Sequence, residues 1–294
     1  MNQFLERLQS GEVLVADGST GASLQKMGLK PGIPPEDLVF DQPEMVLQLE
    51  NAFVAAGSDI LLTDTFGGTR LRMKESKYAQ RSAQVNTRAA ELARQAASAR
   101  AGVLVAGSIG PTGLLLKPLG PLTVEEATAA FAEQAKALAE GGVDLLVIET
   151  MFAFEEADAA FKGARSVTDL PIVVSFSYDR GVRTMMGVKP VDMLKKYSEI
   201  GAAAIGANCG TTLENMEKVI QEYTAVGVQV PLWAKPNAGQ PHLVNGETVF
   251  DVTPDQMAEY AVKYVALGVR VVGGCCGNLP EHVQAIAQAV KKGK

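Results

Sequence analysis

Short apolar runs alternate with longer segments of helical spacing along the whole chain. Eight such runs, rich in β-branched residues, recur about every 37 residues, close to the length of one βα unit. Eight successive βα units predict an α/β protein with a single (β/α)8 TIM barrel domain over residues 1–294. The expected strands are residues 13–17, 59–63, 103–106, 143–148, 171–176, 202–206, 231–234 and 269–272.

Local signals at the junctions support the same alternation. Six glycines stand just before expected strands, where each is predicted to end a helix in the left-handed conformation: Gly57, Gly102, Gly142, Gly201, Gly227 and Gly268. Residues 124–140 carry an apolar stripe behind a Thr123/Glu126 capping box, so they are predicted to form a helix. A doubly wound sheet is the alternative architecture, but neither a dinucleotide fingerprint nor a Walker motif occurs.

Charge and composition exclude several classes of function. The formal net charge is −6, and the longest basic run is Lys291-Lys292, so nucleic acid is not an expected partner. No stretch approaches 18 uninterrupted apolar residues, and the first residues do not resemble a secretion signal. We therefore expect a cytoplasmic protein without a membrane partner. Three cysteines are too few for a disulfide framework.

All three cysteines follow expected strands at the end of the barrel that carries active sites. Cys209 comes after the sixth strand, and Cys275 and Cys276 come after the eighth, flanked by Gly273, Gly274 and Gly277. Cysteine often fills space in a core, but this joint placement favours a shared role. Adjacent residues of a regular strand point to opposite faces, so Cys275 and Cys276 can reach one ion only if the backbone bends.

A set of three thiolates predicts a particular metal chemistry. Zinc held by three protein ligands keeps its fourth position open, as catalytic zinc sites do. Three thiolates leave the centre electron-rich, so a thiol is a better guest there than water. A thiol bound there would lose its proton and stay nucleophilic, which predicts alkyl or methyl transfer to sulfur.

Other polar residues are expected at the same rim. Asp17 follows the first strand and Glu149 the fourth, and both could bind an α-amino group, although either could instead cap a helix or a loop. Lys235 ends the seventh strand, so a Schiff-base lysine of an aldolase is an alternative. His242, placed in a loop, and His282, placed in the last helix, are interpreted as surface residues and not as ligands.

These residues together identify a family resemblance over nearly the whole chain. The chain resembles the homocysteine S-methyltransferase family, and within it the homocysteine-binding module of cobalamin-dependent methionine synthase. The motifs that carry the resemblance are Asp17-Gly18 with Gly21, Thr63-Asp64-Thr65-Phe66, Gly107-Ser108-Ile109-Gly110-Pro111-Thr112-Gly113, Glu149-Thr150, Asn208-Cys209, Pro236-Asn237-Ala238-Gly239 and Gly273-Gly274-Cys275-Cys276-Gly277.

The resemblance implies a role for each matching residue. Cys209, Cys275 and Cys276 would hold Zn²⁺, and homocysteine would supply the fourth sulfur. The amino-acid end of homocysteine would be bound by Asp17, Gly18 and Glu149. Asn237 would lie near the zinc and occupy its open position when substrate is absent.

The resemblance leaves the methyl donor open. A full cobalamin-dependent methionine synthase has folate, cobalamin and activation modules, which 294 residues cannot contain. The loop 117–122 is more similar to the methionine synthase branch, so we expect methylcobalamin or another methylcorrinoid on a partner protein acting in trans. S-methylmethionine or betaine are the alternative donors, and Asp64 stands where the family usually has Asn. A redox or sensor barrel using Cys275 and Cys276 is the alternative of a different class.

Overall fold

The strands form where the alternation predicts them, and they confirm the (β/α)8 barrel. The computed structural model describes residues 2–210, 212–227, 229–244 and 247–291. Its main sheet has eight parallel strands in the order β1-β10-β7-β6-β5-β4-β3-β2. They are β1 (Leu14–Val15), β2 (Ile60–Leu62), β3 (Leu104–Ile109), β4 (Leu145–Met151), β5 (Ile172–Phe176), β6 (Ala204–Cys209), β7 (Leu232–Pro236) and β10 (Val269–Val272).

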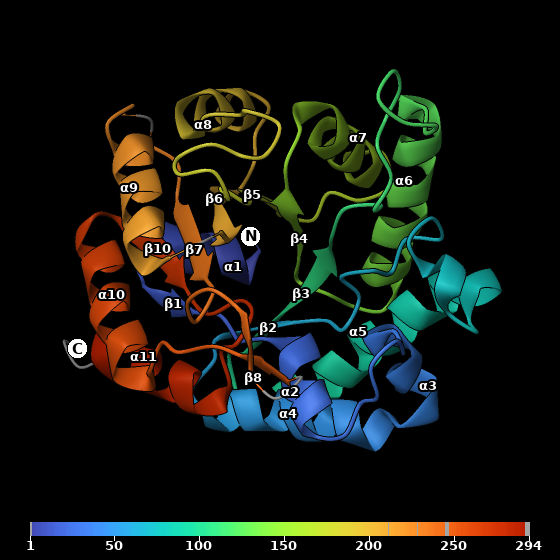
Figure 1. Ribbon diagram of the computed structural model, residues 1–294, viewed down its shortest axis with the longest axis horizontal. Helices are drawn as coiled ribbons and strands as arrows, with labels where there is room; N and C mark the ends of the chain where they lie inside the picture. The colour runs from blue at the N-terminus through green and yellow to red at the C-terminus, as the bar shows by residue number, and fades with distance from the viewer. Residues whose placement is uncertain (1, 211, 228, 245–246, 292–294) are drawn as a thin grey trace.

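Helices surround this sheet on the outside, as the view in Figure 1 shows. The first connection holds α2 (Thr20–Lys26), α3 (Leu38–Asp41) and α4 (Pro43–Ala55), together with the 3-10 helix η1 (Pro35–Asp37). The 3-10 helices η2 (Met73–Glu75) and η3 (Ala79–Arg81) precede α5. The remaining outer helices are α5 (Ser82–Ala97), α6 (Val124–Glu140), α7 (Phe154–Arg165), α8 (Pro190–Glu199), α9 (Leu213–Thr224), α10 (Pro254–Ala266) and α11 (Pro280–Lys291).

The barrel closes between its first two strands and is plugged at its amino-terminal end. A parallel bridge joins Ala16 to Ile60, and the Asp17 N–H donates to the Ile60 carbonyl at 3.0 Å. Inside the barrel, alternate residues of the strands form one apolar cluster. Helix α1 (Gln3–Gln9) adds Phe4 and Leu8 to this cluster. The carboxyl ends of the strands are therefore left as the end that can hold a site.

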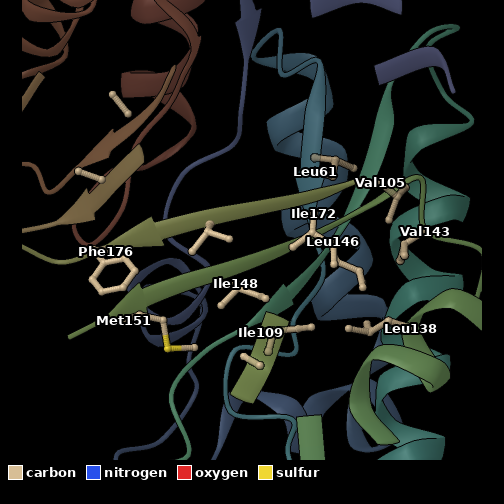
Figure 2. Close-up of a cluster of buried hydrophobic side chains, with 14 of the residues drawn as sticks. Leu61, Val105, Ile109, Leu138, Val143, Leu146, Ile148, Met151, Ile172 and Phe176 are labelled. Atoms are coloured by element: carbon tan, nitrogen blue, oxygen red, sulfur yellow. The ribbon is translucent and has the colours of Figure 1, made fainter. Parts of the chain in front are cut away.

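A second apolar layer lies between the strands and the outer helices. Figure 2 shows part of it, where Val105 and Ile109 of β3 and Leu146 and Ile148 of β4 face the helices, with Leu138 of α6 among them. All five side chains are buried. Gly107 lies in this layer, where an added Cβ would come within 2.9 Å of Leu138 and of Leu146. The outer layer thus sets how closely helices approach the strands.

The predicted junctions are confirmed at Gly57, Gly142, Gly201 and Gly268, each of which directly follows the C-cap of a helix. Gly102 lies four residues beyond the C-cap Ser98 of α5 and Gly227 two beyond the C-cap Ala225 of α9, so these two do not end a helix. All six have positive φ, from 72° at Gly227 to 104° at Gly268. Helix α6 has the predicted ends and a complete capping box between Thr123 and Glu126. None of the helices in the described part of the chain has the length and apolarity needed to cross a membrane.

Helix α1 and the hairpin after β7 are among the elements that were not predicted. Helix α1 precedes the first strand, and its role as a plug depends on packing that one apolar pair does not reveal. A hairpin of β8 (His242–Val244) and β9 (Glu247–Val249) extends from the connection after β7. His242 therefore lies in a strand and not in the loop that we predicted.

Candidate metal and substrate site

The three cysteines meet at the carboxyl end of the barrel. Cys209 is the last residue of β6, and Cys275 and Cys276 follow β10. Their sulfur atoms all lie within 4.8 Å of one another, which is the spacing of ligands on a single metal ion. The Sγ atoms of Cys209 and Cys275 are 2.8 Å apart, and all three cysteines are free. Residues 66 positions apart in the chain are thus brought together by the order of the strands.

The backbone after β10 bends so that two neighbouring cysteines face one point. The Cys275 N–H still donates to the Pro236 carbonyl of β7 at 2.8 Å, but the Asn278 N–H turns back to the Cys275 carbonyl at 3.1 Å. Gly277 completes this turn with φ of 78°. At Gly274 a Cβ would come within 2.2 Å of the Asn278 side chain. The predicted departure from extended backbone is therefore present, and glycines permit it.

The asparagine just before Cys209 connects the cysteines to the carboxylate of β4. Asn208 is buried, and its Nδ2 lies 3.7 Å from the Cys209 sulfur, 3.8 Å from the Cys275 sulfur and 3.3 Å from Oε2 of Glu149. Its Oδ1 accepts hydrogen bonds from the Ser175 hydroxyl at 2.6 Å and the Thr150 N–H at 2.9 Å. The shortest bond of Nδ2 goes to the Thr150 hydroxyl at 2.6 Å. Both ends of the amide are therefore held in one orientation, with Nδ2 between Thr150, Glu149 and the two sulfurs.

Asn237 links the two cysteine loops. Its Oδ1 accepts from the Cys276 N–H at 3.0 Å, and its Nδ2 donates to the Gly210 carbonyl at 3.2 Å. It therefore lies beside the cysteines, as expected. In this arrangement its oxygen is directed to the backbone of a ligand loop.

Glu149 is a buried carboxyl group beside the thiols. Its Oε1 accepts from the Ser108 hydroxyl at 2.6 Å. Burial raises the pKa of Glu149 to about 7, with Lys235 opposing the shift and Cys275 adding to it. Near neutral pH the group is thus divided between its neutral and ionised forms, and an arriving cation would favour the ionised form.

Asp17 is already paired. Its Oδ1 lies 2.7 Å from Nζ of Lys235, and its Oδ2 accepts from the Leu62 N–H at 2.7 Å. Burial raises the pKa of Asp17, although Lys235 opposes the shift. For Lys235, burial lowers the pKa, but Asp17 and Glu149 together raise it above its ordinary value. A Schiff-base nucleophile needs a neutral amine, so this ion pair counts against the aldolase alternative.

Gly18 provides a close approach of backbone segments next to Asp17. A Cβ there would come within 2.3 Å of the Asn278 carbonyl oxygen and 2.8 Å of the Phe53 ring. The following Ser19 N–H donates to that same carbonyl at 2.8 Å. Gly18 thus ties the loop after β1 to the cysteine turn after β10.

Hydrogen bonds among the thiols shift their pKa values in opposite directions. Those with Cys209 and Cys275 lower the pKa of Cys276, whereas those with Cys275 and Cys276 raise the pKa of Cys209. The thiol of Cys276 is therefore the most acidic of the three.

The histidines lie outside this site, but the surface prediction for His282 is wrong. His282 is buried, with Nδ1 accepting from the Leu279 N–H at 3.2 Å and Nε2 3.0 Å from the Val252 carbonyl. It joins the start of α11 to the segment before α10, a tertiary contact that its local sequence does not indicate. His242 is exposed, as expected.

Two functional contributions were missed from the sequence. Asn208 and Asn278 both belong to quoted motifs or lie beside them, yet neither was given a role. Asn278 is fully buried and donates to the Pro236 carbonyl at 3.0 Å. For Asn208 the adjacent cysteine was the available signal, whereas nothing near Asn278 in the sequence indicated its contact with β7.

Comparison with known proteins agrees with this geometry. The sequence model of homocysteine S-methyltransferase matches residues 14–290. The chain belongs to the homocysteine S-methyltransferase family. Among solved structures, the homocysteine methyltransferase MmuM from Escherichia coli, in its metallated form, superposes with a TM-score of 0.82 at 24% identity, over 97% of this chain and 99% of that one. A methyltransferase from Methanosarcina mazei gives a TM-score of 0.61 at 14% identity, over 99% and 97%. Both of these likenesses establish the shared fold.

Proposed function

We propose that the chain is a zinc-dependent enzyme that transfers a methyl group to the sulfur of homocysteine and so forms methionine. The observation that carries this proposal is the convergence of Cys209, Cys275 and Cys276 within 4.8 Å at the catalytic end of the barrel. Family membership supports homocysteine as the acceptor. The metallated form of MmuM supports a metal in this fold. A reducing, cytoplasmic compartment would keep the three thiols free.

The donor set fits zinc because three thiolates leave one tetrahedral position for a substrate. When bound, zinc would supply a Lewis acid that keeps the homocysteine thiol deprotonated at neutral pH. The chain's own residues prepare the ligands. Asn208 places its Nδ2 within 3.8 Å of two of the sulfurs, and Asn237 holds the two ligand loops together. The site therefore has its orientation before substrate arrives.

Recognition of the amino-acid end of homocysteine is assigned to Glu149, with Asp17 and Gly18 beside it. Glu149 is buried and bonded through Ser108 and Asn208, so its position is fixed. Asp17 contributes negative charge but shares it with Lys235. A site that holds both the sulfur and the ammonium of its substrate selects for the distance between these two groups. Cysteine, which is one methylene shorter than homocysteine, should therefore bind poorly.

We assign the methyl group to a methylcorrinoid, methylcobalamin or a relative, presented by a partner protein. The loops after β2, β3, β5 and β7 expose large apolar side chains at the catalytic end, which suits contact with a bulky macrocycle and its carrier. They are Phe66, Leu115, Leu119, Met185, Met186, Leu243 and Val244. In the transfer, a sulfur electron pair forms the new S–C bond, and the pair of the breaking bond stays on the donor.

Two measurements on the purified protein test this function. Metal analysis should find one zinc per chain, and Cys209→Ala, Cys275→Ala and Cys276→Ala should each lose most of it. The exposed His242→Ala variant is the control and should keep its zinc. Full zinc in all three cysteine variants would refute the metal site. A metal-free protein with reversibly oxidised Cys275 and Cys276 would support the redox alternative.

The second measurement is methionine formation from homocysteine with a set of donors. Methylcobalamin should support turnover, and a methylcorrinoid protein should support faster turnover. S-methylmethionine and betaine should give negligible rates. Efficient turnover with either small donor would overturn the corrinoid assignment while leaving the homocysteine methyltransferase intact.

A further inference from the structure

Two residues at the carboxyl end of the barrel have a backbone conformation that side chains rarely adopt. Apart from glycines, Thr150 and Cys209 are the residues of the described chain with positive φ, 61° and 55°. This left-handed region is unfavourable for residues with a Cβ, and most of all for a β-branched residue such as threonine. Such conformations persist where surrounding contacts enforce them, and they cluster at functional sites. Cys209 is a proposed metal ligand, whereas Thr150 is not, so its strain needs another explanation.

The strained residue of β4 gives this strand a second side chain at the site. Pairing with β5 shifts between Ile148 and Met151, so Glu149 and Thr150 form a bulge. Regular alternation would place Ile148 and Met151 on opposite faces of the strand, yet both join the outer apolar layer, where Figure 2 shows them. The two residues between them, Glu149 and Thr150, both contact Asn208 instead.

The end of β6 has the same arrangement. Ile205 and Ala207 belong to the outer apolar layer, so a regular strand would also direct Cys209 toward the helices. With its positive φ, Cys209 instead brings its sulfur to 2.8 Å from that of Cys275. A left-handed residue near the end of each strand thus adds one side chain to the same place, and Asn208 lies between the two.

Thr150 holds the Asn208 amide through two hydrogen bonds. Its N–H donates to Oδ1 at 2.9 Å, and its hydroxyl accepts from Nδ2 at 2.6 Å. A backbone N–H can only donate, so it fixes the amide oxygen on its own side. The Ser175 hydroxyl also contacts this oxygen, but a hydroxyl can donate or accept and does not select one orientation. The contacts of Thr150 therefore decide which end of the amide faces Glu149 and the sulfurs.

We propose that Thr150 is a positioning residue, which holds the Asn208 amide in the one orientation that links Cys209 to Glu149. The inference rests on the proposed function, in which Cys209 binds the metal and Glu149 binds the substrate ammonium. Without the Thr150 hydroxyl, Nδ2 would lose its shortest hydrogen bond and the amide could tilt. The metal ligand and the carboxylate would then lose their mutual placement.

Binding of Co²⁺ to the metal-free protein tests this role, because cobalt held by thiolates has a characteristic visible absorption. Thr150→Val removes the hydroxyl and keeps the branched shape, whereas Thr150→Gly removes both the hydroxyl and the strain. Thr150→Ser keeps the hydroxyl and is the conservative variant. Thr184→Val is the matched control, since Thr184 is a buried threonine of a neighbouring loop whose hydroxyl donates to the Phe152 carbonyl at 2.6 Å.

Thr150→Val and Thr150→Gly should bind Co²⁺ about tenfold more weakly or worse and shift its absorption bands, as expected when the partner of a ligand-orienting group is lost. Thr150→Ser and Thr184→Val should keep the affinity and the spectrum of the unmodified protein. The result for Thr150→Gly separates positioning from a structural role. Glycine adopts the left-handed conformation without penalty, so it would serve as well as threonine if Thr150 only shaped the turn. Full affinity in Thr150→Gly would therefore overturn the proposal.

A second comparison tests whether Thr150 acts through Asn208. In an Asn208→Ala protein the amide is gone, so adding Thr150→Val should weaken Co²⁺ binding no further. A further loss as large as that in the unmodified background would also overturn the proposal. If the unmodified protein did not bind Co²⁺ through its cysteines, the proposed metal site would fail, and this inference with it. Normal binding by both the unmodified protein and Thr150→Gly would overturn the inference alone.

Discussion

At the scale of single residues, one amide and one carboxyl group connect the metal ligands to the substrate end of the site. Asn208 contacts both, through Nδ2, and it cannot rotate because Ser175 and Thr150 hold its oxygen. The hydrogen bond from Asn208 Nδ2 helps to fix the position of the Glu149 carboxyl group. Geometry at the cysteines and geometry at the carboxylate are therefore not independent.

Glu149 gives a prediction with a defined pH dependence. Its pKa of about 7 means that ionisation, and so its attraction for an ammonium, increases as pH rises through 7. The affinity of homocysteine relative to 4-sulfanylbutanoate, which is homocysteine without its ammonium, should rise over that range. The ammonium-free ligand corrects for ionisation of the thiol. Glu149→Gln should lower this ratio about 10- to 100-fold, for a loss of about 1.5 to 3 kcal/mol, and make it independent of pH. An unchanged ratio would remove Glu149 from recognition.

At the scale of elements, the sequence predicted the barrel strands and the outer helices, but only part of what the side chains in the turns do. Period and glycine position predicted all eight barrel strands and helix α6 because both depend on neighbours in the chain. The bend at Cys275 and Cys276 followed from the flanking glycines. The roles of Asn278 and His282 could not follow, because each acts on a segment far away in sequence.

The cysteine turn after β10 is where a single methyl group should matter. In Gly274→Ala the new Cβ would overlap the Asn278 side chain at 2.2 Å, so the turn must shift and carry Cys275 with it. We expect weaker zinc binding, measured by competition with a chelator, and an unchanged far-ultraviolet circular dichroism spectrum. Gly21→Ala is the control, since its Cβ would meet nothing within 4 Å on α2. Equal zinc affinity in the two variants would contradict the argument.

At the scale of the whole molecule, two buried carboxyl groups with unpartnered oxygens, those of Glu50 and Asp64, should lower stability as pH rises. Below the ordinary pKa of a carboxyl group, Glu50 and Asp64 are protonated in folded and unfolded chains alike. As pH rises further, the unfolded chain releases these protons first, so the folded state loses stability until its own raised pKa values are passed. The double variant Glu50→Gln, Asp64→Asn should be more stable than the unmodified protein at pH 7.5 and differ little near pH 4.

Urea unfolding of the ligand-free protein at several pH values measures this difference. Glu156→Gln serves as the control, since its buried carboxyl group accepts a hydrogen bond from Thr112. A double variant that is less stable than the unmodified protein at pH 7.5 would show that the two carboxyl groups support the fold.

The plug made by α1 has a consequence for the order of events. Because Phe4 and Leu8 close the amino-terminal end of the barrel, both reactants must enter through its carboxyl-terminal end. Under the proposed methyl transfer, the acceptor that binds next to the cysteines would enter first, and the donor would then stand between it and solvent. The methylated product would leave only after the spent donor had moved away. The closed end of the barrel therefore predicts ordered binding, in which the acceptor binds before the donor and the product of the acceptor is released last.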